Sequence, residues 1–166
     1  MKLKTIKSKA EIKKPFPEVY LIDADEKTCR GIIASLKDKK FGGEIAVLGR
    51  DDKFNRRVLE TLKIDYLVSP ELGTRKDTLK QRDSGLNHVL AKIAAAKNVK
   101  IVIDFDDLNK LKGKGKALRL GRIMQNVKVC RRAKCKMKIF GSADEKELKA
   151  FGFSIGMSSV QVRESV

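Results

Sequence analysis

Short, continuously apolar runs recur along the chain and alternate with segments whose apolar residues are spaced every three or four positions. The apolar runs are typical of buried strands, and we predict five of them, at 18–24, 44–49, 64–69, 99–105 and 136–143. The spaced segments predict amphipathic helices, at 25–40, 51–63, from Ser84 onward, and at 117–134, 144–153 and 158–165. Strand and helix therefore alternate throughout, which favours an α/β fold with a parallel sheet covered by helices.

Side chains that cap helices stand where the predicted helices begin. Asp25, Asp51 or Asp52, Ser84, Asp144 and Ser158 are the expected N-caps. Periodicity does not separate an open doubly wound sheet from part of a (β/α) barrel. There is no internal repeat, no dinucleotide fingerprint and no Walker spacing.

The length of 166 residues predicts one domain. We take residues 15–166 as this domain, barrel-like in architecture, and residues 1–14 as a basic arm expected to be poorly ordered. No apolar run is long enough for a membrane span, and the first residues lack the apolar core of a secretory signal. We therefore expect a cytoplasmic protein without a membrane partner.

Charge changes this picture most. The chain carries 38 Lys and Arg against 21 Asp and Glu, a net charge of +17, and no acidic residue occurs from Asn109 to Ala143. Cations that displace counterions from phosphates are the physical basis of nucleic-acid binding, so we expect a polyanion as partner. Aromatic residues are only 5% and Trp is absent, which favours contacts to phosphates and shape over base stacking. Candidate contacts in this basic stretch are Lys112, Lys114, Lys116, Arg119, Arg122, Arg131 and Arg132.

A second basic group precedes the helix that Ser84 is expected to cap. It comprises Arg75, Lys76, Lys80 and Arg82. A helix N-terminus offers free N–H groups and a positive dipole end, so these side chains could complete a phosphate cradle. The alternative is a loop that is basic only for solubility.

Catalytic residues are harder to find in the sequence. The single histidine, His88, points away from the apolar stripe of its helix and has no nucleophile beside it, so we interpret it as a surface residue. Acidic residues follow several strands, where they could hold cations in a metal-dependent phosphoesterase or could simply cap helices. A hydrolytic metal barrel would need more histidines, and the three cysteines are expected to be free, buried thiols. We expect no catalytic residue, no metal and no cofactor held by the protein.

One long segment resembles a known family. "DYLVSPELGTRKDTLKQRDSGLNHVLAKIA" (65–94) is similar to the signature of archaeal ribonuclease P protein component 3, the counterpart of the eukaryotic thirty-kilodalton subunit. Weaker matches are "VKIVIDF", "QNVKVCRRAKC", "KIFGSA" and "ELKAFGFSIGMSSVQV", so the resemblance runs from about residue 18 to the end. Below, 65–94 is called the signature segment.

The resemblance implies a TIM-type barrel related to metal-dependent phosphoesterases that acts as a non-catalytic, RNA-binding subunit. In this family the RNA subunit uses Mg²⁺ to remove the 5′ leader of precursor tRNA, so the complex is an endoribonuclease. A small ferredoxin-like protein subunit is the implied protein partner. Carried onto this sequence, Arg75, Lys76 and Arg82 would contact RNA. Ser84, Asn87 and His88 would set the loop geometry or touch RNA or the partner.

Family members usually carry two further βα units before the segment that matches 18–24. We therefore predict a partial barrel with five or six parallel strands and helices outside. Its open sheet edges would need a cover, from a partner subunit, RNA, the basic arm or a second copy. Two other functions stay open, a metal-dependent phosphoesterase of barrel type and a generic basic RNA-binding protein.

Overall fold

A single six-stranded sheet, with every strand parallel to its neighbours, organises the protein in the computed structural model, which describes residues 3–73, 76–77 and 82–166. Its strands are β1 (Leu3–Ile6), β2 (Val19–Ile22), β3 (Glu44–Leu48), β4 (Tyr66–Val68), β5 (Lys100–Asp104) and β6 (Met137–Phe140). The spatial order β1-β2-β3-β4-β5-β6 equals the order in the chain. A doubly wound sheet reverses its strand order at a switch point, whereas a barrel adds each strand beside the last. The sheet is thus of the barrel type.

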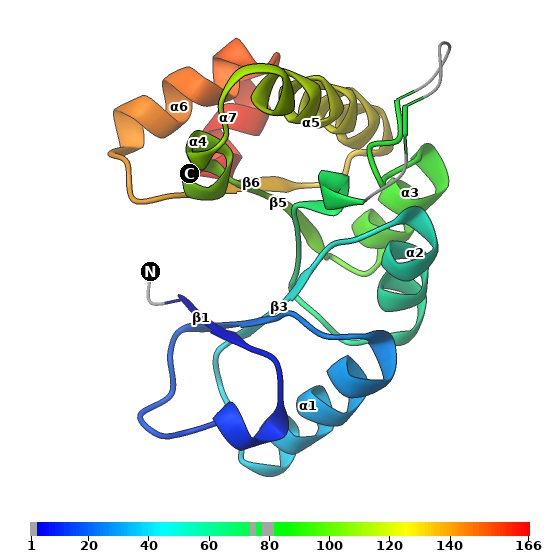
Figure 1. The fold of residues 1–166 in the computed structure, drawn as a ribbon, viewed down its shortest axis with the longest axis vertical. Helices are drawn as coiled ribbons and strands as arrows, with labels where there is room; N and C mark the ends of the chain where they lie inside the picture. Colours follow the sequence, from blue (N-terminus) through cyan, green and yellow to red (C-terminus); the bar gives the residue numbers. More distant parts are fainter. Residues whose placement is uncertain (1–2, 74–75, 78–81) are drawn as a thin grey trace.

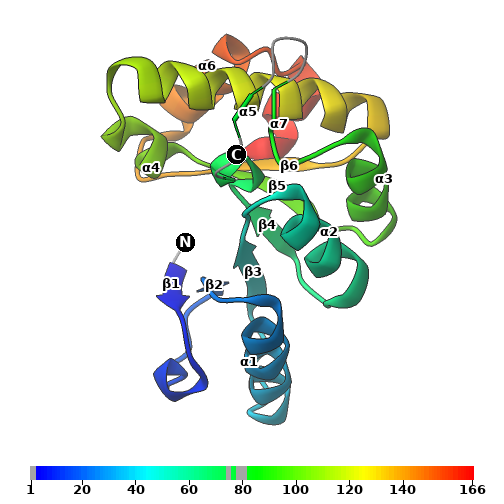
Figure 2. The ribbon, with the colours of Figure 1, turned by 45° about the vertical axis from the view of Figure 1, so that its right-hand side comes forward.

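Helices follow the strands and lie outside the arc that the sheet describes, whose two ends are β1 and β6 (Figure 1). They are α1 (Glu26–Asp38), α2 (Asp52–Thr61), α3 (His88–Ala96), α4 (Phe105–Lys110), α5 (Gly113–Ala133), α6 (Glu145–Ser154) and α7 (Ser159–Ser165), with short 3-10 turns η1 (Lys9–Glu11) and η2 (Pro70–Leu72). Figure 2 shows α5, the longest helix, lying across β5 and β6. The predicted partial barrel with helices outside is confirmed.

Two apolar clusters lie on the two faces of the sheet, because successive strand residues point to opposite sides. The large cluster joins the outer face to the helices and includes Tyr20, Ile22, Leu67 and Ile101. The small cluster lies on the inner face, and its members are Val19, Leu21, Ala46, Tyr66, Val68 and Val102. Both faces are buried, which explains why the strands are continuously apolar in sequence.

The predicted caps are largely confirmed. Asp25, Asp51 and Asp144 each accept a hydrogen bond from a backbone N–H of the following helix, at 3.1, 2.8 and 2.8 Å. Ser158 forms a capping box with Gln161. Ser84 is not a cap, because α3 begins only at His88 and Asn87 caps it at 3.0 Å from the Leu90 N–H.

Two elements were not predicted. The segment treated as a basic arm contains β1, which pairs in parallel with β2 and buries Ile6 completely. The arm therefore covers the edge of β2, one of the four covers considered for the sheet. Between β5 and the predicted helix at 117–134, where the sequence predicted no helix, the structure contains the short helix α4 and the first turn of α5. Asp104 caps α4 through the Asp107 N–H at 2.9 Å.

Candidate nucleic-acid interface

The segment after β4 makes a sharp turn that buries a carboxylate. Ser69 adopts the left-handed conformation (φ 48°, ψ 58°), and its N–H donates to the Val102 carbonyl at 2.8 Å. The turn continues into η2, where Glu71 is only 2% exposed. A charge that is so deeply buried needs a partner of opposite sign.

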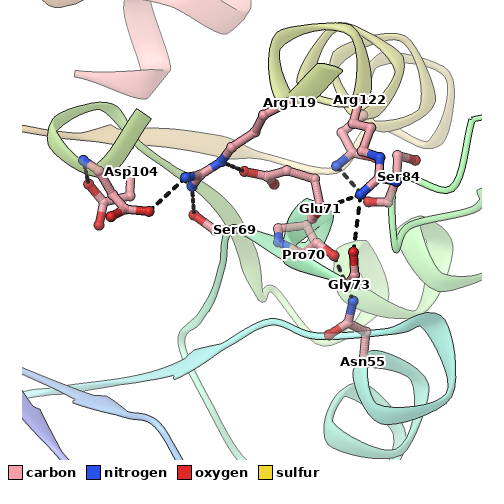
Figure 3. A network of polar contacts seen from close by, with 11 residues as sticks. Asn55, Ser69, Pro70, Glu71, Gly73, Ser84, Asp104, Arg119 and Arg122 are labelled. Atoms are coloured by element: carbon pink, nitrogen blue, oxygen red, sulfur yellow. Dashed lines mark hydrogen bonds and ion pairs between the residues drawn. The ribbon is translucent and has the colours of Figure 1, made fainter. Parts of the chain in front are cut away.

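Arg119 of α5 supplies this partner (Figure 3). Its Nε lies 3.1 Å from Glu71 Oε1, its Nη1 lies 2.6 Å from Asp107 Oδ2, and its Nη2 donates to Ser69 Oγ at 3.1 Å. Burial raises the pKa of the Glu71 carboxyl, and the Arg119 guanidinium opposes that rise. Arg119 thereby ties α5 to the ends of β4 and β5.

Arg122, one turn further along α5, holds the next part of the signature segment. Its Nη1 donates to the carbonyls of Glu71 and Gly73 at 3.2 and 3.1 Å, and its Nε donates to Asp77 Oδ1 at 3.0 Å. Asp77 Oδ1 also accepts the Asp83 N–H at 2.8 Å. Burial raises the pKa of Asp77, but this hydrogen bond and Arg122 outweigh it and hold the pKa below its usual value. Both ends of the basic loop are therefore fastened to one arginine.

Asn55 of α2 holds the same segment from the other side. Its amide nitrogen lies 2.9, 3.2 and 2.9 Å from the carbonyl oxygens of Arg50, Pro70 and Gly85. Gly85 has φ +66°, and a Cβ there would lie 1.8 Å from the Pro70 oxygen. Only glycine fits this position, because the two backbone segments touch.

The predicted RNA-binding residues fall into several groups in the structure. Arg75 and Lys80 lie outside the described residues. Ser84, Arg119 and Arg122 are buried, and both guanidiniums are engaged inside the protein. Arg119 and Arg122 therefore support the loop in place of the predicted RNA contact, whereas Ser84 fits the loop-geometry alternative of its prediction. Arg131 is exposed but donates to Gln161 at 3.0 Å and to the Gly156 carbonyl, so it also fastens α7 to α5.

The remaining predicted residues reach the surface or lie close to it. Lys76, Arg82, Asn87, His88, Lys112, Lys114 and Arg132 are exposed, and Lys116 is half-buried with its Nζ 2.9 Å from Asn109 Oδ1. His88 lies in the first turn of α3, on the polar side, as predicted. Lys112, Lys114 and Lys116 gather at the start of α5, whereas Arg131 and Arg132 lie at its end. Helix α5 has 21 residues and is therefore about 30 Å long. Exposed cations therefore flank both ends of one helix.

Sequence reasoning missed the supporting residues Asn55, Glu71 and Asp77. The sequence does carry a signal for the buried side of α5. Arg119, Arg122 and Asn126 fall at helical spacing on the same face as the apolar residues Ile123, Val127 and Cys130. No local pattern pairs them with their carboxylates, which lie 48 residues away for Glu71 and 45 for Asp77.

The carboxylates at the strand ends have structural partners. Asp104 caps α4, and Glu71 and Asp107 both pair with Arg119. Across residues 3–73, 76–77 and 82–166, no three His, Cys, Asp or Glu side chains gather as metal ligands would. The three cysteines are free and buried as predicted, and burial raises the pKa of Cys29 to about 11. Among the same residues, no helix is long and apolar enough to cross a membrane.

Fold and site together define a class, an open parallel (β/α) barrel whose long basic helix is braced by buried ion pairs. Comparison with known proteins identifies the relatives within this class. The chain is 31% identical over 118 residues to ribonuclease P protein component 3 of Methanococcus maripaludis strain C6, which covers 69% of this chain and 48% of that protein. It is 26% identical over 163 residues to the protein of the same name from Thermococcus gammatolerans, covering 94% of this chain and 72% of the relative. The chain is thus a relative of archaeal ribonuclease P protein component 3, as its signature segment predicted.

The match has defined limits. The chain spans about half the length of most curated relatives it matches, from 44% to 58% of the first five. No protein-family model matches it. A chain in the cryo-EM structure of archaeal ribonuclease P with mature tRNA shares the fold, with a TM-score of 0.67, 22% identity and coverage of 87% of this chain and 63% of that one. The crystal structure of an uncharacterized protein has a TM-score of 0.60 at 11% identity, over 90% of this chain and 42% of that chain.

Proposed function

We propose that the chain is an RNA-binding protein subunit of ribonuclease P, which supports RNA-catalysed removal of the 5′ leader from precursor tRNA in the cytoplasm. The observation that carries the proposal is its similarity, over 64% to 94% of its length, to curated proteins named ribonuclease P protein component 3. Its ribonuclease P RNA partner, and a small ferredoxin-like protein subunit, follow from that relationship as proposed partners.

The surface of the protein suits such a partner. Net charge is +17, and Lys112, Lys114 and Arg132 are exposed on or beside α5. Exposed cations attract phosphates over long range and gain affinity by releasing counterions. Because Trp is absent and aromatic residues are scarce, the proposed contacts are to phosphates, with bases contributing little.

The protein itself is proposed to be non-catalytic and to hold no cofactor. In support, Asp104, Asp107 and Glu71 occupy the strand ends, where barrel enzymes place catalytic groups, and all three are used for capping or ion pairing. The Mg²⁺ that the reaction needs is assigned to the RNA subunit. In the part of the chain that the structure describes, no group of metal ligands favours the metal-dependent phosphoesterase as a second function.

Reconstitution tests the proposal. An archaeal ribonuclease P RNA is assembled with its other protein subunits but without component 3. Cleavage of precursor tRNA is then measured over a range of Mg²⁺ concentrations, with this chain added in one sample and omitted from the other. We expect cleavage of precursor tRNA at low Mg²⁺ only when the chain is present. Unchanged cleavage without it at every Mg²⁺ concentration would remove the proposed role.

A charge-matched pair of variants tests whether α5 provides the contact. Lys112→Glu with Lys114→Glu should weaken binding to the RNA, because two phosphate-neutralising cations become repulsive. Lys27→Glu with Lys37→Glu changes the net charge equally on exposed positions of α1, at the other end of the sheet (Figure 1). We expect this control to bind nearly normally. Equal weakening by both pairs would indicate a non-specific polycation, which is the generic RNA-binding alternative.

A further inference from the structure

Gly121 lies in the middle of α5 and is buried by a side chain from another segment. A Cβ built on Gly121 would meet only atoms of Arg82 as its three nearest neighbours, Nη1 at 2.7 Å, Cζ at 2.9 Å and Nε at 3.3 Å. Arg82 Nη1 donates to the Gly121 carbonyl at 3.1 Å. The guanidinium therefore lies against the helix backbone, at a position where any side chain would be in its way.

The backbone around Arg82 is fastened to the same helix one turn later. Gln125 Nε2 donates to the Arg82 carbonyl at 3.2 Å, and Asn126 Nδ2 donates to the Ser84 carbonyl at 3.1 Å. The Arg82 backbone thus lies beside Gln125, whereas its side chain reaches back to Gly121. This direction points the guanidinium toward the lysine-rich start of α5.

Arg82 differs from the two arginines that brace the loop. Arg119 and Arg122 are buried against carboxylates, whereas Arg82 is exposed and has no carboxylate within ion-pair distance in the described part of the chain. A guanidinium has five N–H donors, and in that part of the chain Arg82 uses one of them, toward Gly121. The others suit the oxygens of a phosphate, which arginine binds in bidentate fashion.

We propose that Gly121 is a positioning residue for RNA binding, because it seats Arg82 on α5 and so joins the signature loop and α5 into one phosphate-contacting surface. The inference rests on the proposed function and adds a residue to it. Along the helix axis, Gly121 lies about 7.5 Å beyond Lys116 and about 10 Å before Lys128, at 1.5 Å per residue. Arg82 therefore supplies an exposed cation to the middle of a helix whose own central cations, Arg119 and Arg122, are buried.

Gly121→Ala separates position from charge. The substitution leaves every charge in place but puts a methyl group where the guanidinium lies. The helix itself should gain stability, since Gly is less favourable than Ala in a helix interior. Gly115→Ala is the matched control, on the same helix, because a Cβ there would meet nothing within 4 Å.

Binding of the whole chain to an archaeal ribonuclease P RNA transcript is measured between about 50 and 200 mM monovalent salt. In a plot of the logarithm of the binding constant against the logarithm of the salt concentration, each phosphate contact contributes a slope of about 0.9. One lost contact corresponds to about an eightfold weaker affinity at 0.1 M salt and a slope lower by about one. We expect this result for Gly121→Ala and for Arg82→Ala, with no added loss in the double variant and no fall in melting temperature for Gly121→Ala.

Three results would overturn the inference. Gly121→Ala could bind like the parent while Arg82→Ala is weakened, the two losses could add in the double variant, or Gly115→Ala could weaken binding as much as Gly121→Ala. Each of these leaves the proposed function intact. A parent chain that shows no binding to the transcript contradicts the proposed function itself, and the inference with it.

Discussion

Arg119 gives the sharpest test of how the strand ends are held. Within the described residues, Arg119 is the only cation paired with Glu71, so Arg119→Met leaves a carboxylate that is 2% exposed without its counter-charge. Removing one partner of a buried ion pair costs about 3–5 kcal/mol, because the remaining charge stays buried without compensation. Asp107 suffers less, since its side chain is 43% exposed and water can replace the arginine.

Urea unfolding measures this cost. With a dependence of about 2 kcal/mol per molar urea, typical of small proteins, the midpoint should fall by about 2 M. The double variant Arg119→Met with Glu71→Leu should recover most of the loss, because replacing both buried partners by apolar residues is often nearly neutral. The pairing would be refuted if the single variant lost less than about 1 kcal/mol of unfolding free energy, or if the double variant recovered none of the loss.

The same variant should show a defined pH dependence. Burial raises the pKa of Glu71 and Arg119 opposes the rise, so loss of Arg119 should raise the pKa of Glu71 further. A carboxyl whose pKa is higher in the folded chain stabilises the fold while protonated, and this contribution is lost as pH rises through the folded-state pKa. The deficit of Arg119→Met relative to the parent should therefore be smaller below pH 4.5, the ordinary value for Glu, than at neutral pH. A deficit that grows toward acid pH would contradict this assignment.

Three further substitutions follow from the same network and its neighbours. Gly85→Ala should cost more than the about 1–2 kcal/mol of a left-handed non-glycine residue, because its Cβ meets the Pro70 carbonyl as well; an unfolding midpoint close to the parent's would contradict that contact. Asn55→Ala should cost about 3 kcal/mol or more, since it leaves three carbonyls without their donor and each unsatisfied buried carbonyl costs about 1–3 kcal/mol. Hydrogen exchange of backbone amides near Pro70 and Gly85 should rise, and unchanged exchange would contradict the proposed role of Asn55 in holding the signature segment. Ser158→Ala should cost about 1 kcal/mol by loss of the capping box of α7, whereas Ser159→Ala, in the first turn of the same helix, serves as the control in thermal melts and should change little.

The strands and most caps could be predicted because their signals are local. A parallel strand that is buried on both faces needs a continuous apolar run, and an aspartate before a helix caps it through its own neighbours. β1 lacks such a signal. Three of its four residues are exposed and only Ile6 is fully buried, so its pairing with β2 decides its conformation.

The candidate site shows the opposite case. Arg119 and Arg122 were predicted to contact RNA because they lie in a basic stretch without acidic residues, yet both are buried. Two of their carboxylate partners, Glu71 and Asp77, lie more than 40 residues earlier in the chain. Leu118, an apolar residue of the same predicted helix, is 47% exposed. Helix periodicity predicts which face of a helix is turned inward. Whether a charged residue can lie on that face depends on a carboxylate or carbonyl partner from elsewhere in the chain.

Identification of the RNA that the chain binds in cells tests the central claim most directly. The tagged chain is crosslinked, recovered under denaturing conditions, and its bound RNA is sequenced beside that of the Lys112→Glu, Lys114→Glu variant. The account predicts that ribonuclease P RNA is the most enriched species and that the variant loses it. Enrichment of ribosomal or unrelated RNA in proportion to abundance, equally in both samples, would contradict the assignment to ribonuclease P.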